Sequence, residues 1–573
     1  MKQSIKVFQN SRFVLRDFLE WNPQLFRELK GRLKPKNILI TAAISLIAQL
    51  VVGLYFLGQL PEPISDPLAV SSQYSRYCYG DIYLGSTACT TDLLNHWVIN
   101  WQLLWLDLFI ALSTISIFAL LGVGTYMLIV DTVKEETRGT LNFIRLTPQS
   151  AASILLGKIL GVPVLLYVGV LLTLPLHLVA GLSARIPLDL IIGFEVVVIA
   201  SCAFFYSAAL LWSLTNNGLA GFKPWFASGA VLLFLFVACI AVSDRFSGVN
   251  NNILDGFILL YPGTMLSYLI DNTFISPGKI AFLTASQLGE LRFYGQQLLV
   301  PANIGMGFVL LNYSLWTYWL WSALKRRFHN PQSTLISKTQ SYGLTACFVM
   351  ITLGFCLQTD NHHVLSHNFR ILQCLLFIFF LGLIAALSPH RQALQDWSRY
   401  RHQVRRKDNL LWKEMVIGEN SPSTVAIAIN LLFTTAYITP SLFFFPLKDQ
   451  TWGIFWGLLL GANIMLLYAV VAQLILTAKS QKRAIWAAVT IASLVVIPPL
   501  GFGFAKIMPV YAPIPWLFTF LPTIATEYAT IYPIALAVLG QWLAISIISW
   551  QMTNKLRQAG ASETKTLLSQ LER

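Results

Sequence analysis

Charged residues are scarce in this sequence. Asp, Glu, Lys and Arg make up 12% of its 573 residues, whereas the hydrophobic residues make up 55%. A soluble protein of this length forms several domains and carries about twice that share of charge. The apolar residues also fall in runs of about 20, the length at which a helix crosses a hydrocarbon core of about 30 Å. The composition therefore excludes a soluble multidomain protein and predicts a polytopic membrane protein.

The apolar runs predict an all-α membrane protein with about 12 transmembrane helices. The 36 residues before the first run are polar and basic, and no small-residue cleavage site follows that run, so a cleaved signal peptide is not expected. The runs cover residues 38–58, 103–130, 159–181, 187–214, 225–243, 303–324, 342–358, 371–388, 424–445, 452–478, 486–505 and 533–550.

The positive charge of the chain follows this topology. A formal net charge of +14 would by itself suit a nucleic-acid-binding protein. With the amino terminus in the cytoplasm, however, 32 of the 40 Lys and Arg residues fall in cytoplasmic segments, which is the positive-inside pattern of membrane proteins. We therefore expect cytoplasmic N- and C-termini, a lipid bilayer around the chain, and no nucleic acid as a partner.

The order of the runs predicts four parts of the chain. These are a cytoplasmic tail with an interfacial helix (1–36), a first six-span unit (37–330), a second, divergent six-span unit (331–550) and a cytoplasmic tail (551–573). Both halves place a sizeable outer loop before their last span, at 244–300 and 507–532. The stretch from 409 to 424 resembles the amino-terminal tail, and if it opened the second unit, that unit would hold only four spans. We favour two six-helix halves.

Catalytic and nucleotide-binding motifs are missing from the sequence. It has no G-x-x-x-x-G-K-[ST] loop for phosphates, no H-E-x-x-H, no paired cysteines at zinc spacing and no G-x-S-x-G. Three histidines in one outer loop (His362, His363 and His367) are more typical of solvated side chains than of a metal site. We therefore predict no catalytic residues, no metal site and no cofactor bound by this chain.

The seven cysteines fall into two groups. Five lie in apolar runs and are interpreted as small core residues. Cys78 and Cys89 share the outer loop 61–98, where an oxidising environment would allow a disulfide. Two unpaired thiols are the alternative, and the sequence leaves both open.

Glu195 is the ionisable residue placed deepest in a predicted span. Burying it costs several kcal/mol unless it faces the helix bundle or a cavity. One interpretation is a residue of a transport pathway or gate. The other is a protonated, hydrogen-bonded packing residue, and this second interpretation is favoured slightly.

The tail segment 22–37 has the pattern of a basic amphipathic helix. Asn22 is a good N-cap, followed by Pro23 at the first helical position. Apolar residues then recur at helical spacing among Lys and Arg, as Leu25, Phe26, Leu29 and Leu33. We expect this helix to lie along the inner membrane surface.

The segment 135–158 reads EETRGTLNFIRLTPQSAASILLGK and has ordered start and stop signals. Gly139 ends one helix, and Leu141, Ile144 and Leu146 form a short apolar stripe. Thr147 and Pro148 then have the pattern of an N-cap and a first helical residue. We expect a helix, a break, a short helix and a new helix that enters the third span.

This segment resembles the signature of ABC-2 type transporter permeases. The matching residues are Glu135, Arg138, Gly139, Thr140, Leu141, Thr147, Pro148, Ser150, Gly157 and Lys158. The expected interface with an ATP-binding subunit consists of Glu135, Glu136, Arg138, Gly139, Thr140, Leu141, Thr147 and Pro148. Thr137 and Asn142 depart from the pattern, since the family often has acids there. The resemblance implies a coupling helix at about 135–150 that docks on a separate ATP-binding subunit, in the inner membrane of a bacterial cell. ATP and Mg²⁺ would then be bound by the partner subunits, of which we expect two, and the transporter would be an exporter.

The resemblance leaves several features of this chain open. If the halves do not form a pseudo-dimer, the chain would instead act as a homodimer. Its basic loop 389–422 either contacts the second ATP-binding subunit or serves only to retain that loop inside. Short helices in the outer loops are also implied. The alternatives from other classes are a membrane-embedded enzyme acting on a lipid or lipid-linked sugar, and an ion-coupled secondary carrier. Nothing in the sequence selects a substrate.

Overall fold

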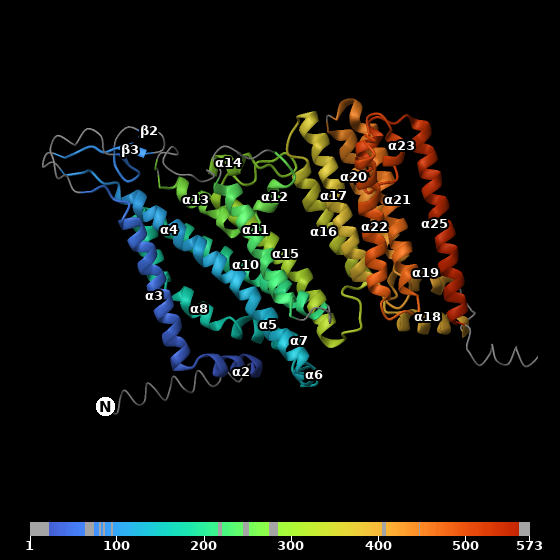
Figure 1. Ribbon diagram of the computed structural model, residues 1–573, viewed down its shortest axis with the longest axis horizontal. Coiled ribbons are helices and arrows are strands. Elements are labelled where there is room, and N and C mark those ends of the chain that lie inside the picture. The colour runs from blue at the N-terminus through green and yellow to red at the C-terminus, as the bar shows by residue number, and fades with distance from the viewer. Residues whose placement is uncertain are drawn as a thin grey trace, which may run out of the picture. The chain divides into compact units, whose positions relative to one another are not determined.

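The computed structural model describes most of the chain, and helices form about three quarters of the described residues (Figure 1). The described residues are 22–62, 74–79, 82–83, 86–92, 96–215, 221–243, 251–273, 275, 285–403, 408–445 and 447–560. Most of the two predicted tails, residues 1–21 and 561–573, lies outside this part.

The chain divides into two compact units, with the main division after Pro331. Unit 1 holds residues 1–250, 257–291 and 297–331, and unit 2 holds 251–256, 292–296 and 332–573. The short helix α12 (Asp255–Ile258) spans one of the minor boundaries. Each unit is described separately below.

Unit 1 contains the amino-terminal helix, a run of long helices and the segment from 135 to 158. Its elements are α2 (Pro23–Arg32), α3 (Pro35–Leu57), α4 (Trp101–Phe118), the π-helical η2 (Ala119–Val123), α5 (Gly124–Thr137), α6 (Thr140–Arg145), α7 (Ala151–Gly161), α8 (Val164–Leu171), α9 (Leu174–Ser183), α10 (Leu188–Thr215), α11 (Lys223–Ser243), η3 (Pro262–Met265), α13 (Leu266–Asp271), α14 (Ala285–Glu290) and α15 (Ala302–His329).

Unit 2 combines long helices with two short ones in the basic loop. Its elements are α16 (Lys338–Cys356), α17 (His362–Leu387), α18 (Arg391–Gln403), α19 (Asp408–Ile417), α20 (Thr424–Phe444), η5 (Lys448–Gln450), α21 (Thr451–Leu476), α22 (Arg483–Phe504), α23 (Pro513–Trp516), α24 (Thr523–Thr526) and α25 (Ile531–Gly560).

Within the described residues, 11 helical segments are long and apolar enough to cross a membrane. They coincide with eleven of the twelve predicted runs, so the chain is a multi-pass, α-helical membrane protein. The remaining run forms α15, which is 28 residues long. It is less apolar than the others because three Trp and two Tyr lie between residues 313 and 321, and indole and phenol groups weaken the apolar signal while remaining suited to membrane interfaces.

A small sheet in the loop between α3 and α4 of unit 1 is an exception to the all-α prediction. Strands β1 (Tyr74–Ser75), β3 (Ser86–Ala88) and β2 (Ile82–Tyr83) pair antiparallel in that order. Next to these strands, Cys78 and Cys89 form a disulfide. Of the two alternatives left open by the sequence, the structure therefore has the disulfide and not two unpaired thiols. Arg76 anchors the loop to α4 through two contacts with Asp107, at 2.7 and 2.9 Å.

Short helices form in both loops that were predicted to lie outside, as the family resemblance implied. In unit 1, η3 and α13 are buried along their whole length except at Asp271, and they pack against α4, α10 and α11. In unit 2, α24 packs against α21. These segments fill one end of their own unit's helix bundle instead of extending into solvent.

Candidate functional site

The amino-terminal helix α2 docks against α7, the short apolar helix that precedes the third candidate span. Asn22 caps α2 by accepting from the Leu25 amide at 3.1 Å, and its side chain also donates to the Ser153 carbonyl on α7 at 2.7 Å. A Cβ at Gly157 would lie 2.8 Å from the Leu25 nitrogen, closer than real Cβ contacts come. Glycine is therefore required at 157 for this close approach of the two helices.

The face that α2 buries differs from the predicted apolar stripe. Gln24, Leu25 and Glu28 are buried, whereas Phe26 is 42% exposed. Because Gly161 leaves room for the Glu28 side chain, whose Cβ would be 2.5 Å from a Cβ there, a polar face can pack on α7. The helix exists as predicted, but it is oriented by specific polar contacts as well as by its apolar residues.

Six charged side chains join α2, α5 and α7 at this end of unit 1. Three cations balance three carboxylates, and we call these six residues the charge network. It consists of Arg27, Glu28 and Arg32 on α2, Asp131 and Glu135 on α5, and Lys158 on α7.

Lys158 lies at the centre of the charge network. Its side chain is 1% exposed, and its Nζ lies 2.7 Å from Asp131 Oδ2 and 2.6 Å from Glu135 Oε2. Asp131 also accepts from Arg32 at 2.7 Å, and Glu135 from Arg27 at 2.5 Å. Because a buried ammonium is tolerated only where carboxylates neutralise it, these contacts hold the ends of α5 and α7 to α2.

The carboxylates of the charge network are not arranged as an open metal site. Oxygens of Glu28, Asp131 and Glu135 come within 4.8 Å of one another. Lys158, Arg27 and Arg32 already occupy positions beside these oxygens. A divalent cation would have to displace an ammonium or guanidinium group, so the donor set fits a protein-internal ion network better than a metal.

The segment that follows α5 forms a helix, a break, a short helix and a new helix. The break is at Gly139, whose φ of 72° is the left-handed conformation that favours glycine at a helix end. The short helix α6 then buries Leu141 and Ile144 in a cluster with Phe328 of α15 and residues of α7 and α10. This succession of elements confirms the prediction for residues 135–158.

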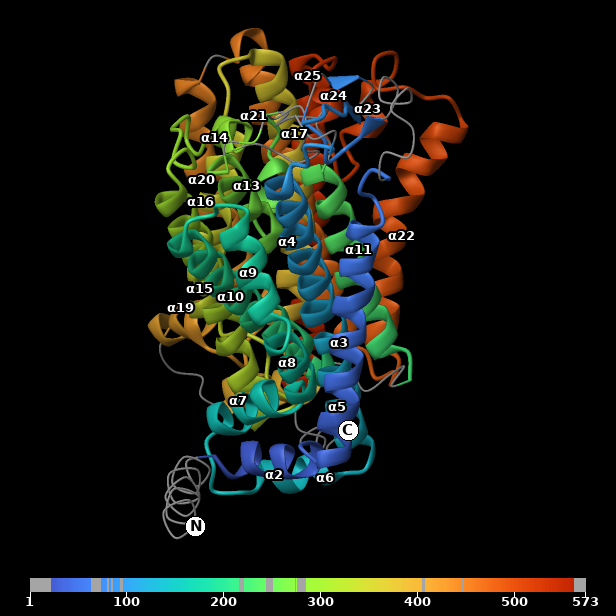
Figure 2. The same ribbon diagram turned by 90° about the vertical axis from the view of Figure 1, so that its left-hand side faces the viewer.

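Two large apolar side chains of this segment are exposed. Phe143 on α6 is 80% exposed, and Leu146, directly after it, is 84% exposed. Leu146 was expected to share the stripe of Leu141 and Ile144, and this was wrong: the helix ends at Arg145, so the side chain leaves the helical pattern. Figures 1 and 2 show α6 and α2 at the same end of unit 1. Phe143 and Leu146 thus form an apolar knob at this end.

The predicted start of α7 at Thr147 and Pro148 is also wrong. Ser150 is the N-cap, because its hydroxyl accepts from the Ser153 amide at 3.1 Å, and the helix begins at Ala151. The Thr147 hydroxyl instead donates to the Ile144 carbonyl at 2.7 Å, closing the end of α6. Pro148 follows in the exposed turn that joins α6 to α7.

Some polar and charged residues of the segment 135–158 contact unit 1, and others are exposed. Glu135 belongs to the charge network, and Glu136 is half-buried near the guanidinium of Arg145. Burial lowers the pKa of Arg145, and Glu136 opposes that shift. In contrast, Arg138 and Thr140 are exposed. The acids predicted as partner contacts are therefore engaged within unit 1.

Asn142, where the resembled family often has an acid, makes a neutral contact. Its Oδ1 accepts from Arg145 at 3.0 Å, and the Arg145 guanidinium lies 5.7 Å from the Phe328 ring centre. In unit 1 the local hydrogen bond thus takes the place of the ion pair that the family pattern implies.

Glu195 is part of a polar contact chain between three spans of unit 1. Its Oε1 lies 3.3 Å from Nδ1 of His177 on α9, whose Nε2 is 2.8 Å from the Ser113 hydroxyl on α4. Ser113 also donates to the Phe109 carbonyl at 2.8 Å, and the Phe109 ring stacks on His177. His177 is hydrogen-bonded to Ser113, whereas its Nδ1 meets Glu195 without hydrogen-bond geometry. The contacts fit a packing role, and they also place a carboxyl and an imidazole side by side within the spans.

Unit 2 anchors its basic loop through a buried lysine. Nζ of Lys338, at the start of α16, donates to the Met415 and Pro422 carbonyls at 2.8 and 2.9 Å and to the Ser421 hydroxyl at 2.5 Å. These contacts hold the end of α19. On α19, Trp412 is 67% exposed, so unit 2 also presents an aromatic side chain from its basic segment.

Comparisons of the chain with protein-family models, with curated proteins and with solved structures find no match. The functional argument therefore depends on the geometry and on the sequence signature.

The sequence analysis missed most of the charge network and the apolar knob. Arg27, Arg32 and Asp131 were visible as charges beside apolar helices, and the spacing of four residues between Glu28 and Arg32 and between Asp131 and Glu135 is a helical signal. Which charge would meet which could not be read from one helix, because the pairs join residues about 100 positions apart.

Proposed function

We propose that this chain is the permease subunit of an ATP-driven exporter of the ABC-2 type, in a bacterial inner membrane. The observation that supports it best is the apolar knob of Phe143 and Leu146, exposed on a short helix whose other face is packed into unit 1. An exposed Phe–Leu pair of this kind is typical of a protein-binding surface. The signature around it names the class of partner, a separate ATP-binding subunit.

The geometry suggests how movement of such a partner reaches the spans. Leu141 and Ile144 attach α6 to α7, α10 and α15 through one apolar cluster. The charge network attaches the adjacent ends of α5 and α7 to α2. A displacement of α6 is thus passed to the second, third, fourth and last spans of unit 1 as a group, because packed side chains do not deform continuously.

A second ATP-binding subunit would bind unit 2. We propose α18 and α19 as its contact, since Arg399 and Trp412 are exposed there. In this arrangement one chain holds both halves of the permease, and two ATP-binding subunits supply ATP and Mg²⁺. A homodimer of the chain would need four such contacts.

The test is to purify the chain from the membranes in which it is made and to measure the ATP-hydrolysing subunit that accompanies it. Replacing Phe143 and Leu146 together by serine should remove one of the two subunits while leaving unit 1 folded, because both side chains are exposed. Leu298→Ser is the matched control, as this side chain is 37% exposed at the opposite end of the unit. If the double variant retains both subunits, α6 is not a docking site.

The Glu195–His177 contact supports one rival, a proton-coupled carrier. Carriers place paired ionisable groups within the spans, and these two side chains meet there. In vesicles without any ATPase, Glu195→Gln and His177→Gln would each abolish transport driven by a pH gradient if the chain were such a carrier. The enzyme alternative gains less support, because Ser113 is 2% exposed and its hydroxyl donates to the Phe109 carbonyl.

A further inference from the structure

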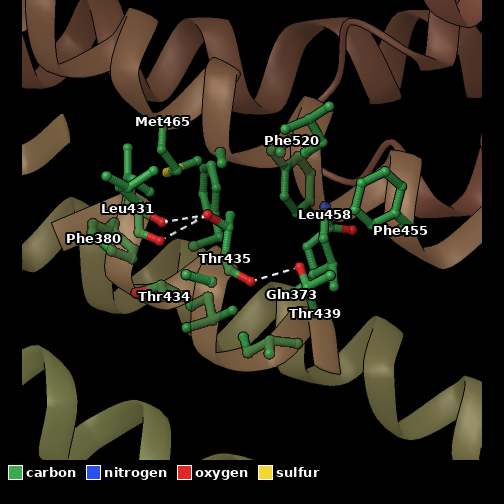
Figure 3. A pocket seen from close by; sticks show the side chains of 18 of the residues that line it. Gln373, Phe380, Leu431, Thr434, Thr435, Thr439, Phe455, Leu458, Met465 and Phe520 are labelled. Carbon is green, nitrogen blue, oxygen red and sulfur yellow. Dashed lines mark hydrogen bonds between the residues drawn. The ribbon is translucent and has the colours of Figure 1, made fainter. Parts of the chain in front are cut away.

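Unit 2 contains a cavity of about 390 Å³ between α17, α20 and α21 (Figure 3). The residues that line it lie near the middle of these three helices, at 373–380, 431–440 and 455–465. Because each helix is long enough to cross a membrane, the cavity lies at mid-depth of the spans. Phe520, from the outer loop before α25, closes one side of it.

The walls of the cavity offer a ligand little polar surface. None of its lining residues, all in the described part of unit 2, is charged. Gln373 donates to the Gly457 carbonyl at 2.8 Å and accepts from the Thr523 hydroxyl. Thr435 and Thr439 donate to carbonyls of their own helix at 3.0 and 2.7 Å, as Figure 3 shows. Their hydrogens are already used, so ions and sugars would lose hydration without replacement.

One backbone acceptor in the wall lacks its usual donor. Pro440 lies inside α20 and has no N–H, so it cannot donate to the carbonyl of Ala436, four residues earlier. Ala436 lines the cavity and is exposed. A carbonyl in such surroundings is costly to leave unpaired, and a ligand hydroxyl would satisfy it.

We propose that this cavity binds a neutral hydrocarbon molecule that carries one hydroxyl group and enters from the surrounding bilayer. The alkyl part contacts Phe377, Phe380 and Phe455, and the hydroxyl donates to the Ala436 carbonyl. A water molecule takes about 30 Å³ in the liquid. With a similar volume for each methylene group, the cavity of about 390 Å³ holds a chain of roughly a dozen carbon atoms. The ligand class follows from the absence of charge in the described lining and from the donor that Pro440 cannot supply to the Ala436 carbonyl.

The experiment uses the full chain in phosphatidylcholine nanodiscs and a 12-carbon alcohol with a photoreactive diazirine in its chain. After irradiation, mass spectrometry locates the labelled residues. Labelling should be saturable, should concentrate on the lining segments of α17, α20 and α21, and should be displaced by 1-dodecanol. Labelling that does not saturate, and that is as dense on exposed residues such as Phe444 and Leu543, would show ordinary lipid contact and overturn the proposal.

Two variants separate a built site from general partition into lipid. Ala462→Phe places a ring in the cavity and should reduce labelling by about tenfold or more. Ala428→Phe, at a half-buried position of α20 outside the lining, is the control and should leave labelling unchanged. Gel filtration establishes that both variants fold. Equal labelling of the two variants would contradict the proposal.

Pro440→Ala tests the hydrogen bond without filling the cavity. The alanine amide can donate to Ala436, so the preference of the site for 1-dodecanol over dodecane as a competitor should fall by about fivefold, as for one neutral hydrogen bond. An unchanged preference would exclude the Ala436 carbonyl as the acceptor. None of these measurements involves an ATP-binding subunit, so specific labelling would stand even if no such partner were found.

Discussion

Replacing Lys158 by methionine should destabilise unit 1 more than its size suggests. The change preserves most of the apolar length of the side chain but removes the ammonium that lies between Asp131 and Glu135. Removing one partner of a buried ion pair costs about 3–5 kcal/mol, because a charge stays buried without compensation.

The structure lowers this value for Lys158. Each carboxylate keeps one arginine, Arg32 for Asp131 and Arg27 for Glu135. The side chains of Asp131 and Glu135 are 18% and 13% exposed, so water reaches these carboxylates in part. We therefore expect a loss of about 2–3 kcal/mol in the free energy of unfolding. Lys158→Met leaves three carboxylates against two cations, so the additional change Glu135→Gln removes the excess negative charge and should restore about half of that loss.

The assay is reversible unfolding of the purified chain by sodium dodecyl sulfate in mixed micelles. Lys134→Met is the matched control, because Lys134 lies on α5, the helix that carries Asp131 and Glu135, with an exposed side chain, and it should change the free energy by less than about 0.5 kcal/mol. If Lys158→Met and Lys134→Met have equal effects, or if Glu135→Gln adds to the loss, the charge network does not hold this end of unit 1 together.

Two further predictions concern the same unit. Gly157→Ala should separate α2 from α7 and lower the free energy of unfolding by about 1–3 kcal/mol. Gly229→Ala, with no atom within 4 Å of the added Cβ, should leave it almost unchanged. The same unfolding assay compares the two variants, and equal losses would refute the close approach. Alkylation of the unfolded chain before reduction should modify five of the seven cysteines, and mass spectrometry should find Cys78 and Cys89 joined; modification of all seven would exclude the disulfide.

Much of the fold could be predicted because it depends on properties of single segments. The length and apolarity of each run determine a span, and Asn22 with Pro23 marks the start of α2. Gly139 likewise marks the break after α5, since few other residues adopt its conformation. These signals act within a few residues, so one sequence is enough to read them.

The parts that could not be predicted depend on contacts between distant segments. Glu135 has the sequence pattern of an exposed acid, yet it forms ion pairs with Lys158 and Arg27 from two other helices. His177 lies in an apolar run like any packing residue, and only the fold brings it to Glu195. The start of α7 was misplaced for another reason, because two N-cap candidates, Thr147 and Ser150, lie three residues apart and local chemistry favours both.

The cavity of unit 2 could not be expected from the sequence at all. Pro440 is visible in a predicted span, and a proline there indicates an unpaired carbonyl. Whether that carbonyl faces lipid, another helix or a cavity depends on how α17, α20 and α21 pack, which helical periodicity alone does not determine.

The most direct test of the proposed function is the mass of the complex that this chain forms in its own membrane, measured by native mass spectrometry after mild extraction. The permease proposal predicts one copy of the chain with two ATP-hydrolysing subunits, reduced to one subunit when Phe143 and Leu146 are replaced by serine. A chain that carries no ATP-hydrolysing subunit under several mild extraction conditions, and still transports its substrate in vesicles, would contradict it.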